Sequence, residues 1–228
     1  MTNHLGDRRW TEFWDPRRRP LLAVPVGSCE QHGPHLPLDT DTRIAMALAD
    51  GLVSTFAAGE VVVAPPLTIT ASGEHGSFPG TLSIGTTVLE QVIIELVRSA
   101  DWAAGVVLIN GHGGNKAPVQ RAVSQLSGER RRVLAWWPTI EGADAHAGHE
   151  ETAMMLALAP DLVHMDRAEV GRTEPLSQLI GEIREGGIQA VSSNGILGDP
   201  RRATAGQGRA MLTKLSIDLV RVVDDWWE

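Results

Sequence analysis

The segment Leu21-Leu22-Ala23-Val24-Pro25-Val26 is the first of four short, almost continuously apolar runs in this 228-residue sequence. The other runs cover residues 61–64, 106–109 and 133–137. Strands that are buried on both faces of a parallel sheet are apolar throughout, whereas half-exposed antiparallel strands alternate apolar and polar residues. The four runs are therefore predicted to be strands of a mostly parallel sheet.

Segments with helical spacing lie between and after these runs. Apolar residues recur at intervals of three and four in residues 42–56 and 86–103, and residues 117–126 and 211–223 are also predicted to be helical. Alternating strands and helices predict an α/β fold. We expect a three-layer α/β/α sandwich whose parallel strands are joined by right-handed crossovers.

The composition, 43% hydrophobic and 21% charged residues, is that of a folded globular protein and not of a disordered chain. We expect residues 1–228 to form a single domain. Residues 186–208 are rich in Gly, Ser, Asn and Pro. Because no second core follows them, they are predicted to form a long ordered loop near the functional face.

Charge and cysteine content exclude several classes of protein. The formal net charge is -8, so the basic surface that attracts nucleic acid is missing. Cys29 is the single cysteine, which rules out an intramolecular disulfide and a cysteine-rich metal site and fits a reducing compartment. No run of about 18 apolar residues is present, so no membrane span is expected. We expect a cytoplasmic protein.

Histidine and acidic residues cluster after three of the predicted strands. Glu30, His32 and Asp41 follow the first, the motif Asn110-Gly111-His112-Gly113-Gly114-Asn115 follows the third, and Asp144-Ala145-His146-Ala147-Gly148-His149-Glu150-Glu151-Thr152 follows the fourth. Ligands bind at the carboxyl edge of an open α/β sheet. Imidazole and carboxylate together suit zinc, manganese or iron. The clusters predict a divalent metal site at this edge.

Two of the clusters also have a structural explanation when they are taken alone. A strand-end acid and an internally hydrogen-bonded histidine would give Glu30 and His32, and a Gly-rich turn with a capping asparagine would give residues 110–115. Three such clusters at one edge are harder to explain in this way. A non-catalytic metal-binding or nucleotide-binding module remains the alternative from another class, although residues 111–114 fit no established phosphate-loop spacing.

The three motifs, in this order along the chain, resemble the creatininase family of metal-dependent amidohydrolases. Residues 73–83 and 190–200 resemble the peptidase branch of that family from mycofactocin biosynthesis. The resemblance implies a creatininase-like fold and hydrolysis of a modified precursor peptide, with release of its C-terminal Val-Tyr-derived dipeptide. The alternative within the family is hydrolysis of a small cyclic amide or formamide. A homo-oligomer is also implied.

The resemblance further implies two divalent ions per chain, zinc, iron or manganese. The implied metal ligands are Glu30, His32, Asp41, His112 and Glu151. Asp41 would bridge the ions, with Glu30 and His112 on one ion and His32 and Glu151 on the other. Creatininase itself has a further acid at the position of Gly114; here that acid is absent, and we expect Glu151 to replace it.

Other site residues are expected from their neighbourhood in the sequence. His146 and Glu151 are predicted to be catalytic, with His146 carrying a proton to the leaving nitrogen, because imidazole titrates at about pH 6.5. The structural alternative for His146 is a helix-opening histidine that is hydrogen-bonded to the backbone. His75, Trp136 and Asn115 are predicted to contact the substrate.

Overall fold

The computed structural model describes residues 3–227, and its centre is a parallel sheet of four strands. The strands are β1 (Leu21–Val26), β2 (Val61–Val63), β3 (Gly105–Asn110) and β4 (Val133–Trp136), in the order β2-β1-β3-β4. In the register of the sheet, Leu21 of β1 lies beside Val61 on one side and Gly105 on the other. The prediction of a parallel sheet is confirmed.

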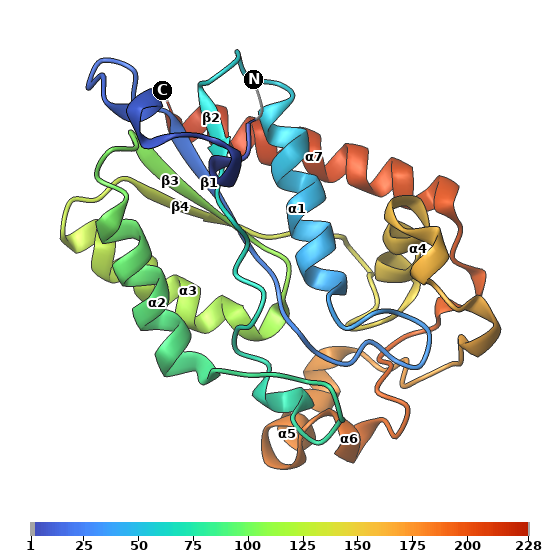
Figure 1. The fold of residues 1–228 in the computed structure, drawn as a ribbon. Helices are drawn as coiled ribbons and strands as arrows, with labels where there is room; N and C mark the ends of the chain where they lie inside the picture. Colours follow the sequence, from blue (N-terminus) through green and yellow to red (C-terminus); the bar gives the residue numbers. More distant parts are fainter. Residues whose placement is uncertain (1–2, 228) are drawn as a thin grey trace.

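Helices cover both faces of the sheet (Figure 1). On one face lie α1 (Thr40–Val53), α4 (His149–Leu158) and α7 (Ala205–Trp227), which pack against one another. On the other lie α2 (Gly85–Ser99) and α3 (Lys116–Gly128). The predicted three-layer α/β/α sandwich is therefore confirmed.

The two faces of each strand explain why the strands are apolar throughout. Leu21 and Ala23 of β1 belong to the core beneath α1, α4 and α7, whereas Leu22 and Val24 belong to the core beneath α2 and α3. Successive side chains of a strand point to opposite faces. Every residue of β1 is consequently buried.

A third apolar cluster lies beyond the carboxyl ends of the strands, where α5 (Leu176–Gly186) and α6 (Ile188–Val191) pack together (Figure 1). The prediction that residues 186–208 form a loop is wrong in part, because α6 and the first residues of α7 lie in this range. The chain turns between α5 and α6 at Gly187, which has a φ of 72°. Helix α6 then buries Ile188 and Val191.

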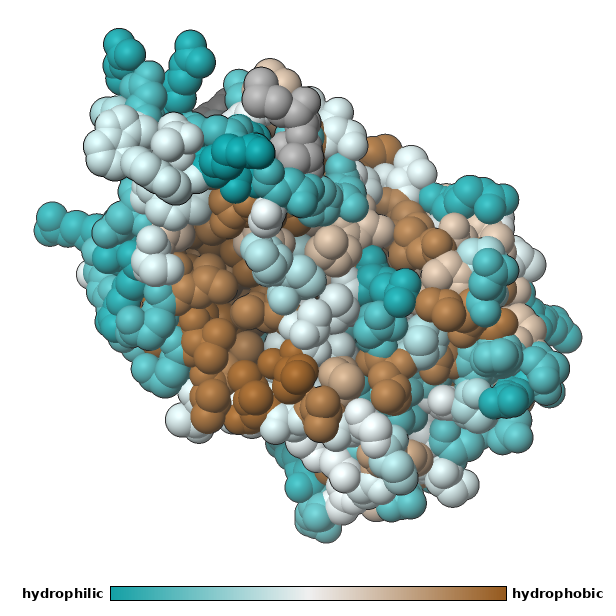
Figure 2. Space-filling model, viewed as in Figure 1, coloured by the Kyte–Doolittle hydropathy of each residue, from teal (hydrophilic) through white to brown (hydrophobic). Residues whose placement is uncertain are grey.

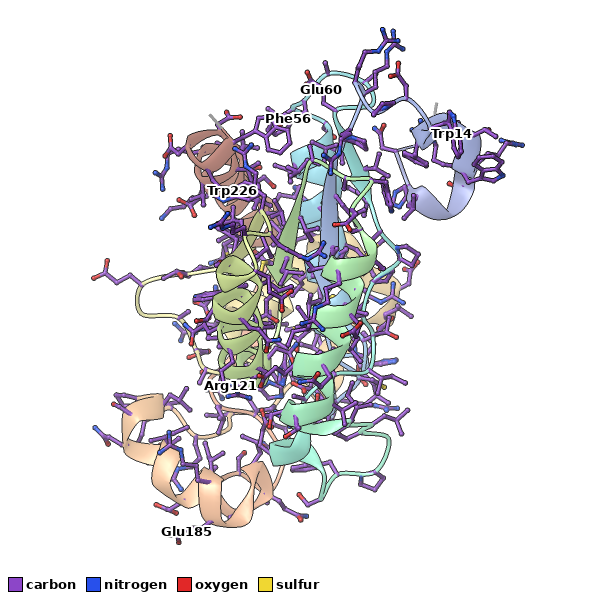
Figure 3. All side chains as sticks on the ribbon, turned by 90° about the vertical axis from the view of Figure 1, so that its left-hand side faces the viewer. Trp14, Phe56, Glu60, Arg121, Glu185 and Trp226 are labelled. Carbon is purple, nitrogen blue, oxygen red and sulfur yellow. The ribbon has the colours of Figure 1, made fainter. Side chains whose placement is uncertain are left out.

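The two ends of the described chain lie far from α5 and α6. Both chain ends are in the upper part of Figure 1, and α5 and α6 are at the bottom. Figure 3 likewise shows Trp226 of α7 and Glu60, just before β2, at the end opposite Glu185 of α5. Among residues 3–227, no helix is long and apolar enough to cross a membrane.

Candidate metal centre

The loop between β1 and α1 supplies three polar side chains to one buried point. Glu30 and His32 follow β1, the chain turns at Gly33 with a φ of 64°, and Asp41 lies in the first turn of α1. A carboxylate is favoured there because the amino end of a helix carries partial positive charge. All three side chains are at most 2% exposed.

His112 extends from the end of β3 toward the same carboxylates. Its Nδ1 lies 3.0 Å from Glu30 Oε1 and 3.2 Å from Asp41 Oδ2. Its Nε2 lies 3.0 Å from the carbonyl oxygen of Ala71 and thus carries the proton of that hydrogen bond. Nδ1 is therefore the atom that faces the shared point.

His32 and Glu151 meet on the other side of Asp41. His32 Nε2 lies 3.2 Å from Asp41 Oδ1 and 3.8 Å from Glu151 Oε2. His32 Nδ1 donates to the carbonyl oxygen of Glu30 at 3.1 Å. Glu151 lies in the first turn of α4 and accepts a hydrogen bond from the backbone N–H of Ala147 at 2.6 Å.

These side chains form two groups of possible metal ligands, and within each group the ligand atoms lie within 4.8 Å of one another. One group is Glu30, Asp41 and His112; the other is His32, Asp41 and Glu151. Asp41 belongs to both groups. A third group combines Glu30 and His32 with His146. The structure thus brings together segments that are distant in the chain, at the carboxyl edge of the sheet.

The surroundings of Glu30 test whether this cluster suits a cation. Both carboxylate oxygens of Glu30 are buried, and neither accepts a well-formed hydrogen bond from any residue in 3–227, although His112 Nδ1 is close. A buried charge without compensation is strongly unfavourable. The residues present therefore fit a divalent cation, which would satisfy these oxygens.

The electrostatics of the cluster point the same way. Burial opposes a charged ring on His32, but the charge of Asp41 and the hydrogen bond to it raise the pKa of His32 to about 10. Burial likewise opposes protonation of His112, yet Glu30 and Asp41 raise its pKa well above the usual value. Burial raises the pKa of Glu151 to about 7. Excess negative charge in the cluster thus draws protons onto both histidines.

His146 lies inside this cluster rather than at its margin. Its Nε2 donates to the carbonyl oxygen of Gln31 at 2.8 Å, and its Nδ1 is 3.9 Å from Glu30 Oε1. Burial and the charges of His32 and His75 hold the pKa of His146 well below its usual value. The ring is therefore neutral at pH 7, with a free lone pair on Nδ1.

His75 also lies deeper than the sequence predicts. It is 3% exposed, and its Nε2 lies 3.4 Å from Glu30 Oε1. Its Nδ1 accepts a hydrogen bond of 2.8 Å from the side-chain amide of Gln31. His75 thus contacts Glu30, and its contact with substrate stays a prediction. Gln31 is a site residue that was not predicted from the sequence.

Trp136 and Asn115 are both buried, and each makes hydrogen bonds to other parts of the fold. The ring of Trp136 belongs to the core on the α7 face of the sheet, and its Nε1–H donates at 3.0 Å to Asp218, a half-exposed residue of α7. The amide nitrogen of Asn115 donates to the carbonyl oxygen of Gly27, and its Oδ1 accepts from the N–H of Ala71. These hydrogen bonds join separate elements of the fold, and the contact of the two residues with substrate stays a prediction.

A cavity of about 530 Å³ opens beside the cluster. His112 and Glu151 line it on the side of the cluster, and Trp137, Lys116 and Leu176 line it elsewhere. Lys116 Nζ lies over the ring of Trp137, 5.7 Å from its centroid. Trp137, one residue after the predicted Trp136, is thus the tryptophan that meets the cavity.

The absence of an acid at Gly114 has a steric basis in this chain. A Cβ there would lie 2.5 Å from His112 Nε2 and 2.6 Å from the carbonyl oxygen of Ala71, and it would also collide with Glu74 Oε1. Glu74 was not predicted from the sequence to be a site residue, yet its carboxylate is 3.4 Å from His112 Nε2. Only its position beside His75 in the sequence could have signalled it.

Comparison with known proteins gives one consistent result. The profile of the Creatininase family, described as creatinine amidohydrolase, matches residues 6–223. The mycofactocin precursor peptide peptidase of Mycolicibacterium smegmatis is 50% identical over 201 residues, which cover 86% of this chain and 81% of that protein. The protein of the same name from Mycobacterium tuberculosis is 45% identical over 220 residues, which cover 92% of this chain and 87% of that protein.

More distant relatives extend the family. The creatinine amidohydrolase of Pseudomonas putida is 31% identical over 72% of this chain and 74% of that protein. A crystal structure of creatinine amidohydrolase superposes with a TM-score of 0.82 at 20% identity, over 98% of this chain and 97% of that one, which shows that the fold is shared. This chain therefore belongs to the creatininase family and is a metal-dependent hydrolase of C–N bonds.

Proposed function

We propose that this protein is a peptidase that uses two divalent ions to cleave a modified precursor peptide of mycofactocin biosynthesis, releasing the C-terminal Val-Tyr-derived dipeptide. The observation that carries the chemistry is the pair of ligand groups that share Asp41, next to a cavity large enough for a peptide end. The choice of substrate is supported by relatives that are 45–50% identical and carry that name.

Each of the two proposed ions would have its own set of ligands. Glu30, Asp41 and His112 would hold one ion, and His32, Asp41 and Glu151 the other. Imidazole and carboxylate donors accept zinc, iron and manganese, and related solved structures include a Zn-Zn type and a Mn creatininase. When bound, such ions polarise a carbonyl group and lower the pKa of water toward about 7.

His146 is the group that would move a proton. Its Nε2–H is fixed on Gln31, so its neutral Nδ1 can accept a proton and return it to the leaving nitrogen. Glu151, whose pKa is raised to about 7 by burial, lies between the cluster and the cavity and would orient the scissile amide. Trp137 would pack against the substrate and exclude water on the opposite wall.

The decisive experiment offers the metal-loaded protein two substrates, the modified precursor peptide and creatinine, and follows the products by mass spectrometry. Cleavage of the peptide two residues from its C-terminus is expected, because the proposed product is the C-terminal dipeptide. His112→Ala, which removes one ligand, should abolish turnover. Turnover of creatinine alone would reject the peptidase proposal.

Hydrolysis of a small amide is the second candidate function. The observation in its favour is the 31% identity with a creatinine amidohydrolase. Other family relatives are named as formylamino-pyrimidine deformylases, so a formamide belongs among the test substrates. A preference for creatinine or a formamide over the peptide would establish this alternative.

A further inference from the structure

Glu74 lies on the far side of His112 from the other acids of the cluster. It belongs to the short 3-10 turn η3 (Gly73–His75), and its Oε1 is 3.4 Å from His112 Nε2. Glu30 and Asp41 face the opposite nitrogen, Nδ1, at 3.0 and 3.2 Å. The imidazole of His112 is therefore held between carboxylates on both edges of its ring.

Two acceptors converge on Nε2 and fix the state of the ring. The carbonyl oxygen of Ala71 is 3.0 Å away, and Glu74 Oε1 is the second. The carbonyl oxygen of Ala71 can only accept, so Nε2 carries a proton, and Nδ1, which faces Glu30 and Asp41, is left as the nitrogen that could bind a metal ion. A carboxylate behind a histidine also makes the other nitrogen a stronger donor to a metal.

Two residues that pack closely against Glu74 are glycines, and a side chain at either of them would collide with it. A Cβ at Gly114 would occupy the place of Glu74 Oε1, and a Cβ at Gly187 would lie 2.8 Å from the carbonyl oxygen of Glu74. Gly187 also has a φ of 72°, which a side chain would oppose. Loops that are distant in the chain thus converge to place one carboxylate.

We propose that Glu74 is a positioning residue of the metal centre. It fixes the orientation and proton of His112 and thereby sets the affinity for the ion that Glu30, Asp41 and His112 would hold. This inference rests on the proposed dinuclear function. It assigns Glu74 no contact with substrate and no place among the ligands themselves.

The test measures zinc affinity on the metal-free full-length protein by competition with a chromogenic chelator. Wild type should take up two Zn²⁺ ions. In Glu74→Ala one of the two affinities should fall by about 10- to 100-fold, the effect typical of losing such a partner, while the other stays unchanged. Glu74→Gln, which keeps an oxygen acceptor without the charge, should lie between the two.

The matched control is Glu90→Gln. Glu90 has a side chain of similar exposure, 20% against 28% for Glu74, and pairs with Arg121 instead of a histidine. Its replacement should leave both zinc affinities at wild-type values. If Glu74→Ala does not fold, Glu74→Gln retains the shape of the side chain and decides the question.

A spectroscopic measurement identifies the affected histidine. In Co²⁺-loaded protein, NMR should show one exchangeable imidazole N–H signal that shifts and exchanges faster in the Glu74 variants, that of His112. The His32 Nδ1–H, which donates to Glu30, should be unaffected. Unchanged affinities, or an equal loss of both, would overturn the inference; a wild type that takes up no Zn²⁺ would instead reject the proposed metal centre.

Discussion

His146 carries the clearest consequence at the scale of single residues. Its Nε2–H is fixed on Gln31 and its Nδ1 is free, so His146→Ala should lower kcat by about 10²- to 10⁴-fold, the usual contribution of a positioned proton-transfer group. Steady-state kinetics and metal analysis of the same preparation would measure this. His164→Ala, at an exposed position, is the control.

The metal content of His146→Ala separates two roles. Retention of both ions with lost activity agrees with proton transfer. Loss of an ion would instead make His146 a ligand, as its grouping with Glu30 and His32 allows. A purely structural role for His146, through its hydrogen bond to the backbone, would predict that the variant keeps both its ions and its activity.

The residues of the site differ in how far the sequence could predict them. Glu30, His32 and His112 are found because strand ends and parallel topology place them at one edge. Gln31 and Glu74 were missed, because their roles depend on which ring nitrogens they face. That geometry arises from the turn at Gly33 and from η3, and no periodicity in the sequence encodes it.

At the scale of elements, adjacent tryptophans at the end of β4 should behave differently. Trp136→Phe removes a hydrogen bond to α7 and should lower the free energy of unfolding by about 1–3 kcal/mol, with little change in kcat. Trp137→Phe should change KM and leave stability near wild type, because Trp137 lines the cavity. Urea unfolding and kinetics of both variants measure this; the reverse pattern would contradict it.

Strands were predicted better than helices for a physical reason. Burial on both faces makes β1 and β3 apolar at every position but the last of β3, so their limits can be read within a residue or so. Helix α5 was not predicted, although Leu179, Ile180 and Ile183 recur at helical intervals; it buries Leu179 and Ile183 against a small cluster of its own. Helix α6 has four residues, too few for a helical period to show.

At the scale of the whole molecule, the binding and removal of metal should be coupled to the release and uptake of protons. His32, with a pKa of about 10, and His112 are both protonated at pH 7 in the metal-free protein, whereas a metal ligand must be neutral. Uptake of metal at pH 7 should therefore release protons. Calorimetry in buffers of different ionisation enthalpy would measure the release, and an enthalpy independent of the buffer would contradict it.

Metal removal should also lower the melting temperature, because it leaves the buried carboxylate of Glu30 without compensation. An ion present at 100 times its Kd stabilises a folded protein by about 2.7 kcal/mol. Scanning calorimetry with and without chelator measures the shift. His112→Ala should show a smaller shift than wild type.

The surface supports the proposal of a homo-oligomer. Figure 2 shows a hydrophobic area on the lower left, in the region of α2 in Figure 1. Large apolar side chains of α2 and the segment before it are 36–52% exposed: Ile69, Leu82, Val88 and Val92. Exposed apolar patches mark interaction sites. Light scattering should give a mass above the 24.5 kDa of one chain, and Val88→Lys should lower that mass. A wild-type protein with the mass of one chain would reject the proposal.

The placement of the chain ends has a practical consequence for handling the enzyme. The two ends of the part of the chain that the structure describes, residues 3–227, lie at the top of Figure 1, whereas the loops with the candidate metal ligands follow the carboxyl ends of the strands toward α5 and α6. An affinity tag, a fluorescent reporter or a tether to a solid support can therefore be joined at either end and still leave the cavity beside the ligand groups unobstructed.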